Sequence, residues 1–111
     1  MQTIKFSYNW NNKLTNAAFT TLRLHNPATY QLGTRYRIEC NGQLRGIAEL
    51  KAVRTFKISV LNEFITFLDT GYNVPETVNL LQTMYKNKNI DWTTQLLDFC
   101  LLVYEKENKL F

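Results

Sequence analysis

The residues most able to do chemistry in this 111-residue chain lie in one short segment, Phe19-Thr20-Thr21-Leu22-Arg23-Leu24-His25. Because alternate residues of a strand face the same side, Thr21, Arg23 and His25 are expected on one face. A hydroxyl, a guanidinium and an imidazole placed together can bind a phosphate or the edge of a base. The alternative interpretation is the outer face of a barrel, where threonine is common because a β-branched side chain suits a strand.

Positive charge is concentrated in the same half of the sequence. The net charge is +4, but residues 1–57 carry nine basic and two acidic side chains, whereas residues 58–111 carry four basic and seven acidic ones. Lysine and arginine bound to phosphates release condensed counterions, so this excess suggests a polyanion such as RNA as a partner. A solvated basic surface is the alternative.

Aromatic residues are interleaved with the arginines, as in many single-stranded nucleic-acid sites. Trp10, which lies among asparagines, is the best candidate for stacking on a base. The candidate binding residues are Trp10, Lys13, Thr21, Arg23, His25, Arg35 and Arg37.

Several kinds of site are excluded by residue type and spacing. Four scattered glycines make no phosphate-binding loop, and His25 has no serine or cysteine partner in a known nucleophile motif. Cys40 and Cys100 are far apart, so they predict neither a zinc site nor a disulfide framework, and both are expected as buried thiols. We therefore expect no metal and no cofactor.

The first half of the chain has the alternation and turn residues of β-strands. Asn41-Gly42 is a strong hairpin signal, because a type I′ turn needs positive φ at both central residues. Asn9 to Asn16 is predicted to be a loop with a short helical turn, and a β-bulge is predicted at Gly46. The expected strands are Thr3–Tyr8, Phe19–Leu24, Arg35–Cys40 and Gln43–Phe56.

The second half changes to helical periodicity. Ser59 is expected to cap a helix over Val60–Leu68, and a second helix is expected to begin at Asn73-Val74-Pro75-Glu76. Leu96–Tyr104 then predicts a final strand. The whole chain, residues 1–111, is expected to form a single α+β domain: a small barrel or curled sheet of about five to six strands, with two helices inserted before the last strand.

The sequence also bears on location. It contains neither an apolar run of roughly 20 residues, the length of a membrane span, nor an apolar segment typical of a signal peptide at its start. We therefore expect a cytoplasmic protein with no membrane partner.

With these elements in order, the chain resembles the ASCH family of the PUA-like superfamily. The resemblance rests on Thr21-Leu22-Arg23, the strand pair across Asn41-Gly42, and a second helix beginning at Pro75-Glu76-Thr77. It covers about Ile4 to Tyr104, and it implies a PUA-like β-barrel with a cleft beside the Thr-Leu-Arg strand that accepts RNA or a modified nucleoside.

Some members of that family are amidohydrolases that remove an acetyl group from acetylcytidine. Their sequences contain a Lys-Thr-x-Thr-x-Arg pattern. Thr21 and Arg23 match the second threonine and the arginine, but the lysine position holds Ala18 and the earlier threonine position holds Phe19. The family's acidic position falls near Asp69.

Three functions follow as expectations. The first is an RNA- or nucleotide-binding module with a basic cleft beside the Thr20–Arg23 strand. The second is an amidohydrolase of an acylated nucleoside, with Lys13, Thr21 and Asp69 as its catalytic groups. The third is a protein-interaction or inhibitor module that uses the acidic half. Convergence of Lys13, Thr21, Arg23 and Asp69 on one pocket would favour the enzyme, and dispersal over an open groove would favour binding.

Overall fold

The structure is a computed structural model, and it describes residues 1–106. Its strands are β1 (Thr3–Phe6), β2 (Ala18–Leu24), β3 (Arg35–Cys40), β4 (Gln43–Lys57) and β5 (Leu96–Tyr104). Its α-helices are α1 (Glu63–Asp69) and α2 (Val74–Met84), and its short 3₁₀ helices are η1 (Trp10–Thr15) and η2 (Ile58–Val60).

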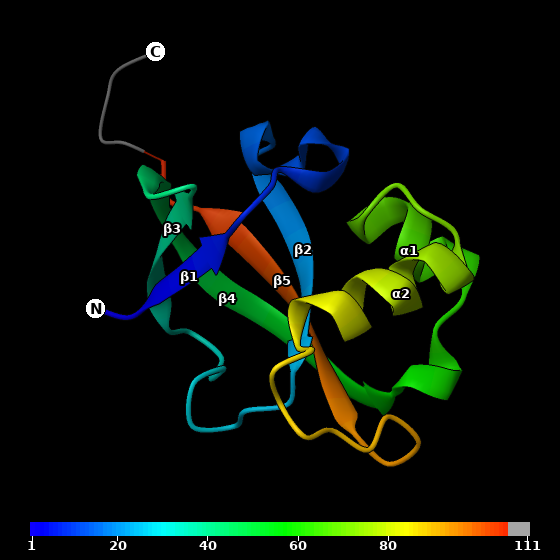
Figure 1. The fold of residues 1–111 in the computed structure, drawn as a ribbon. Helices are drawn as coiled ribbons and strands as arrows, with labels where there is room; N and C mark the ends of the chain where they lie inside the picture. Colours follow the sequence, from blue (N-terminus) through cyan, green and yellow to red (C-terminus); the bar gives the residue numbers. More distant parts are fainter. Residues whose placement is uncertain (107–111) are drawn as a thin grey trace.

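The five strands form one curled sheet in the order β1-β3-β4-β5-β2 (Figure 1). Strands β1 and β3 run parallel, and the other neighbouring pairs are antiparallel. The sheet is a half-barrel, and α1 and α2 lie beside its β2 end (Figure 1). The predicted α+β class is therefore confirmed, with two helices placed before the last strand as expected.

The predicted hairpin between β3 and β4 is present. Asn41 and Gly42 both have positive φ, at 52° and 80°, as a type I′ turn requires. The predicted bulge is also confirmed, since the pairing shifts beside Gly46 and leaves Arg45 without an opposite residue. Gly46 has φ 151°, and a Cβ there would lie 3.0 Å from the ring of Tyr104.

The first α-helix begins later than predicted. Ile58–Val60 forms the 3₁₀ helix η2, and the cap of α1 is Asn62, whose side chain accepts a hydrogen bond of 3.0 Å from Ile65 N. The prediction that Ser59 caps this helix is therefore wrong: asparagine and serine cap equally well, and Ser59 is the middle residue of η2. The second helix begins as predicted, with a capping box between Asn73 and Glu76.

Two groups of buried side chains form the core, and β2 contributes to both. Phe19 packs with Phe6, Leu14 and Tyr36 inside the curl of the sheet. Leu22 packs with Leu61, Leu81 and Leu97 under the helices. Cys40 and Cys100 are both buried as free thiols, as predicted. Since β2 passes from one group to the other, its middle residues lie where the two groups meet.

Candidate functional site

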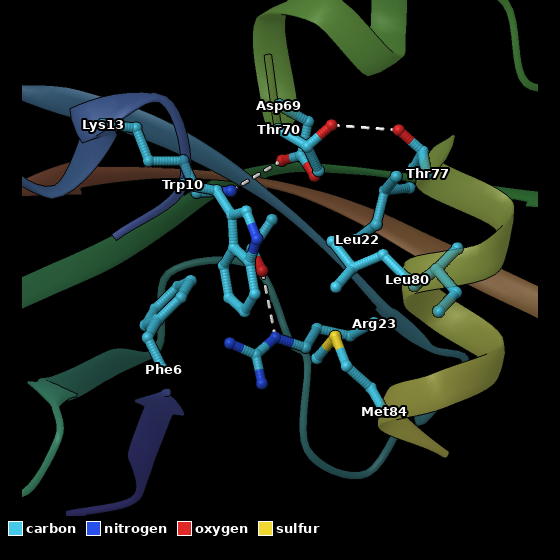
Figure 2. Close-up of a pocket in the computed structure, with 12 residues that line it drawn as sticks. Phe6, Trp10, Lys13, Leu22, Arg23, Asp69, Thr70, Thr77, Leu80 and Met84 are labelled. Atoms are coloured by element: carbon cyan, nitrogen blue, oxygen red, sulfur yellow. Dashed lines mark hydrogen bonds and ion pairs between the residues drawn. The ribbon is translucent and has the colours of Figure 1, made fainter. Parts of the chain in front are cut away.

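A pocket opens at this meeting point of the two core groups, between β1, η1 and β2 on one side and the helices on the other (Figure 2). Its empty space is about 340 Å³, which includes the solvent at its open side. Twelve residues line it: Phe6, Trp10, Lys13, Thr21, Leu22, Arg23, Asp69, Thr70, Thr77, Leu80, Leu81 and Met84. Lys13, Thr21, Arg23 and Asp69 thus converge on one pocket.

Lys13 and Asp69 form a buried ion pair at one end of the pocket. Lys13 Nζ lies 3.0 Å from Asp69 Oδ1, and the two residues are 4% and 3% exposed. Burial lowers the pKa of Lys13, an effect that the charge of Asp69 opposes and that of Arg23 reinforces. Ionisable groups whose pKa is shifted by burial and by a charged partner are concentrated at functional sites. Burying two charges is costly, and a purely structural role seldom requires it.

The two neighbouring threonines of β2 belong to different hydrogen-bond systems. The hydroxyl of Thr20 donates to Asp69 Oδ1 at 2.8 Å. The hydroxyl of Thr21 instead accepts from Arg23 Nε at 3.0 Å, and within residues 1–106 no hydrogen bond joins it to Lys13 or Asp69. Thr21 was expected to supply the catalytic hydroxyl, but the hydroxyl that contacts the ion pair is that of Thr20.

Arg23 is held across the floor of the pocket. Its Nη2 donates to the backbone oxygen of Lys5 at 2.9 Å, and its Cζ lies 4.6 Å from the centre of the Phe6 ring. Lys13 Nζ is 5.6 Å from the centre of the same ring. Phe6 is therefore an aromatic surface flanked by two cations, an arrangement that is electrostatically favourable for ring and cations alike.

The opposite wall is mostly apolar and comes from α2. Leu80, Leu81 and Met84 line it, and Figure 2 shows Leu80 and Met84 on the α2 side, with Phe6 and Trp10 across the pocket. Thr77, on the same helix, pairs its hydroxyl with that of Thr70 at 2.9 Å. These helix residues were not among the predicted site residues. Their spacing of three and four residues indicated a buried helix face without showing that part of the face lines a pocket.

Trp10 lines the pocket from η1. A residue that stacks on a bound base must lie at such a position. Its ring packs edge-on against Tyr8, with 5.4 Å between the ring centres and 66° between the planes. It is half-buried, so one part of the indole is fixed while another part faces the pocket.

His25 lies outside the pocket, although it follows the alternation of Thr21 and Arg23. Strand β2 ends at Leu24, and His25 Nδ1 pairs with Asp98 Oδ1 at 2.8 Å. The buried carboxylate of Asp98 also accepts from Asn26 N at 2.9 Å and from the Thr55 hydroxyl at 2.7 Å. This cluster holds the turn after β2, so it accounts for His25 without a ligand.

The other two predicted binding residues, Arg35 and Arg37, are also outside the pocket. Both are exposed on β3, on the side opposite the buried Tyr36 and Ile38. Arg35 forms an ion pair with Glu105. The structure therefore brings together Trp10, Lys13, Thr21 and Arg23 of the predicted binding set, together with Asp69, and separates the rest.

The chemistry available in the pocket consists of one carboxylate, one amine, one guanidinium, several hydroxyls and two aromatic surfaces. In the part of the chain that is described, no group of three histidine, cysteine, aspartate or glutamate side chains could hold a metal ion. No helix among the same residues is long and apolar enough to cross a membrane. No protein-family model, no curated protein and no solved structure matches the chain.

Proposed function

We propose that the pocket binds a single nucleoside or nucleotide, either free or as one residue of an RNA. Lys13, Thr21, Arg23 and Asp69 converge on one pocket, which by itself favours the enzyme, but the Thr21 hydroxyl bonds to Arg23 and not to the Lys13–Asp69 pair. The observation that carries the binding proposal is therefore the indole of Trp10 in the same pocket as the polar groups of Thr21 and Arg23. The resemblance to the ASCH family, which implies a PUA-like barrel and this class of ligand, supports the same proposal.

The composition of the pocket suits a base. The faces of a base are apolar and stack on aromatic rings, and Trp10 is available for such stacking, whereas the buried ring of Phe6 is already covered by Arg23 and Lys13. Its edge carries donors and acceptors, and Asp69, Lys13 and Thr21 provide matching groups at the polar end. Pockets for small molecules typically combine an apolar lining with a few polar groups of this kind.

A phosphate group on the ligand would lie in a second hollow next to the pocket. Phe6 and Met84 also line this hollow, whose other residues include Lys5, Ser7 and Asn41. An ammonium, a hydroxyl and an amide can all donate hydrogen bonds to phosphate oxygens. Glu39 lines the same hollow and opposes a negative ligand, so Lys5 is the residue that favours a nucleotide over a nucleoside.

Fluorescence of Trp10 provides the test. The chain has two tryptophans, and Trp92 packs against Tyr85 instead of lining the pocket, so a Trp92→Phe background isolates the signal of Trp10. We expect cytidine, adenosine or their monophosphates to change this fluorescence saturably. We expect Arg23→Met to weaken the binding while Arg37→Met, at an exposed arginine outside the pocket, does not.

Two results would contradict the proposal. One is the absence of a saturable change with all four ligands. The other is an equal loss with Arg37→Met and Arg23→Met in a titration with short single-stranded RNA, since it would point to an extended surface on the sheet. Circular dichroism of each variant checks that the fold is retained.

A second candidate, hydrolysis of an acylated nucleoside, is favoured by the contact of Lys13, Asp69 and the Thr20 hydroxyl. In this reaction water adds to the amide carbonyl carbon, the C–N bond breaks, and the amine leaves with one proton, which yields a carboxylic acid. A buried carboxylate and an amine of lowered pKa are groups that can accept and return that proton.

Acetate release from acetylcytidine tests this second candidate. If the ion pair transfers the proton, Asp69→Asn and Thr20→Val should each abolish or strongly reduce the release, while Thr20→Val, at a residue that does not line the pocket, retains nucleoside binding. Hydrolysis that survives Asp69→Asn would contradict the assignment. Loss with Thr21→Val but not with Thr20→Val would return the role to Thr21.

A further inference from the structure

We infer that Asn11 is a positioning residue, which fastens the segment carrying Trp10 and Lys13 onto the end of α1. In this way it fixes the place in the pocket where Lys13 meets Asp69. The inference rests on the proposed ligand site, because it assigns Asn11 a role in that site's geometry.

The side-chain amide of Asn11 contacts α1 directly. Its Nδ2 donates to Phe67 O at 3.3 Å and to Leu68 O at 3.1 Å. The last carbonyls of a helix have no partner within the helix. Phe67 O also accepts from Gly71 N at 3.1 Å, whereas among residues 1–106 the hydrogen bond given to Leu68 O comes from Asn11. Leu68 immediately precedes Asp69, and the contact therefore holds the peptide from which the Asp69 side chain extends.

The backbone of η1 is unusual at the residue that makes this contact. Asn11 and Asn12 both lie in the left-handed region, with φ of 58° and 51°. Outside glycine this region is unfavourable, although asparagine tolerates it better than most residues. Such conformations persist where surrounding contacts hold them, and they are concentrated at ligand sites.

The other end of the segment is fixed to the sheet. Asn9 Oδ1 accepts from Leu14 N at 2.9 Å, and Leu14 is buried in the core group inside the sheet. Among residues 1–106, the hydrogen bonds that join η1 to α1 come only from Asn11 and Lys13. Two kinds of contact thus hold η1 against α1: the Lys13–Asp69 ion pair and the uncharged hydrogen bonds of Asn11.

The two neighbouring asparagines supply a matched pair of variants, Asn11→Gly and Asn12→Gly. Glycine adopts the left-handed conformation readily, so neither change strains the backbone. Only Asn11→Gly removes the bonds to α1, because the described side-chain contact of Asn12 is with Asn9. Nuclear magnetic resonance of the Lys13 side chain then follows its titration, and Trp10 fluorescence in the Trp92→Phe background follows binding of cytidine monophosphate.

We expect Asn11→Gly to move the pKa of Lys13 upward toward 10.5, because the amine gains water and burial is the main cause of its lowering. Asp69 on α1 and Arg23 on β2 are the charged groups that act on it. Losing hydrogen bonds of this kind should also weaken cytidine monophosphate binding about tenfold. Asn12→Gly should leave both quantities as in the wild type.

An Asn11→Gly protein in which Lys13 titrates as in the wild type would overturn the inference, and so would an equal effect of Asn12→Gly. If Asn11→Gly does not fold, Asn11→Ser retains a polar side chain too short to make both contacts, and the same upward movement is expected. If the wild-type protein binds no nucleotide but Asn11→Gly still raises the pKa of Lys13, the proposed ligand is refuted. The positioning role of Asn11 is then retained.

Discussion

Lys13 and Asp69 are 56 residues apart in the sequence, yet their Nζ and Oδ1 atoms lie 3.0 Å apart in an almost fully buried pair. The pair joins η1, which precedes β2, to the end of α1, and Thr20 on β2 contacts the same carboxylate oxygen. Two consecutive elements, η1 and β2, therefore meet the distant end of α1 at one carboxylate. The stability of the fold and the geometry of the pocket depend on the same contact.

Removing one partner of this pair should be far more costly than removing both. We expect Lys13→Met to lower the free energy of unfolding by about 3–5 kcal/mol, because it leaves the Asp69 charge buried without a partner. The double variant Lys13→Met/Asp69→Leu should recover much of that loss, since no charge is then buried. Urea unfolding measures both.

The exposed pair between Lys51 and Glu49 is the control for this prediction, because its Nζ–Oε2 distance is also 3.0 Å. Lys51→Met should change the free energy of unfolding by no more than about 1 kcal/mol, as is usual for a surface pair. Equal losses at the buried and exposed lysines would show that burial does not determine the strength of the Lys13–Asp69 contact.

Much of the sheet could be predicted from the sequence because strand alternation and turn residues act locally. Arg35–Cys40 and Leu96–Tyr104 match β3 and β5 residue for residue, and the Asn41-Gly42 turn requires only its own two residues. The start of α1 could not be predicted in the same way. Ser59 and Asn62 are both good caps, and the formation of η2 decides between them.

Strand alternation could predict only the part of the site that lies on β2. Thr21 and Arg23 share a face of β2, as alternation requires, and they contact each other. His25 continues that alternation in the sequence, but the strand has ended, so it turns to Asp98 instead. Alternation also places Arg37 on a polar face of β3 without showing that this face lies away from the pocket.

The contrast between His25 and Asp98 gives a second prediction. Asp98 is 1% exposed and accepts hydrogen bonds from three donors, so Asp98→Ala should lower the free energy of unfolding by several kcal/mol. His25→Ala removes one of those donors and should cost about 1–3 kcal/mol. Because His25 does not line the pocket, His25→Ala should leave the dissociation constant for a nucleotide unchanged. A weakened nucleotide complex would place His25 in the site after all.

The hollow next to the pocket leads to a third prediction, which concerns the phosphate. If Lys5 contacts the phosphate of the ligand, Lys5→Ala should weaken binding of cytidine monophosphate by about tenfold, since a hydrogen bond to a charged group contributes about 1.5–3 kcal/mol and this exposed lysine falls at the lower end. Binding of cytidine should be unaffected. Lys57→Ala, at an exposed lysine at the far end of β4, is the control. A loss of cytidine binding with Lys5→Ala would mean that Lys5 acts on the fold of the pocket and not on the phosphate.

Stability at alkaline pH provides the last prediction. Burial raises the pKa of Cys100 from 9.0 to about 12 and that of Tyr30 from 10.0 to about 12. Between these values the unfolded chain has released protons that the folded chain still holds, so the stability that these groups contribute is complete below pH 9 and is lost as the pH rises towards 12. Cys100 can lower the free energy of unfolding by up to about 1.4 kcal/mol per pH unit, and the half-buried Tyr30 by less, because solvent screens its interactions.

Urea unfolding at several pH values between 8 and about 11 measures this loss. Tyr30→Phe should flatten the decline above pH 10, because phenylalanine has no proton to release, whereas Tyr8→Phe, at a tyrosine that is 59% exposed, should not. The buried Cys100 thiol should likewise resist a maleimide at pH 8 until the chain unfolds. Rapid labelling of Cys100 in the folded protein, or a decline that Tyr30→Phe leaves unchanged, would show that these two groups do not cause the alkaline loss of stability.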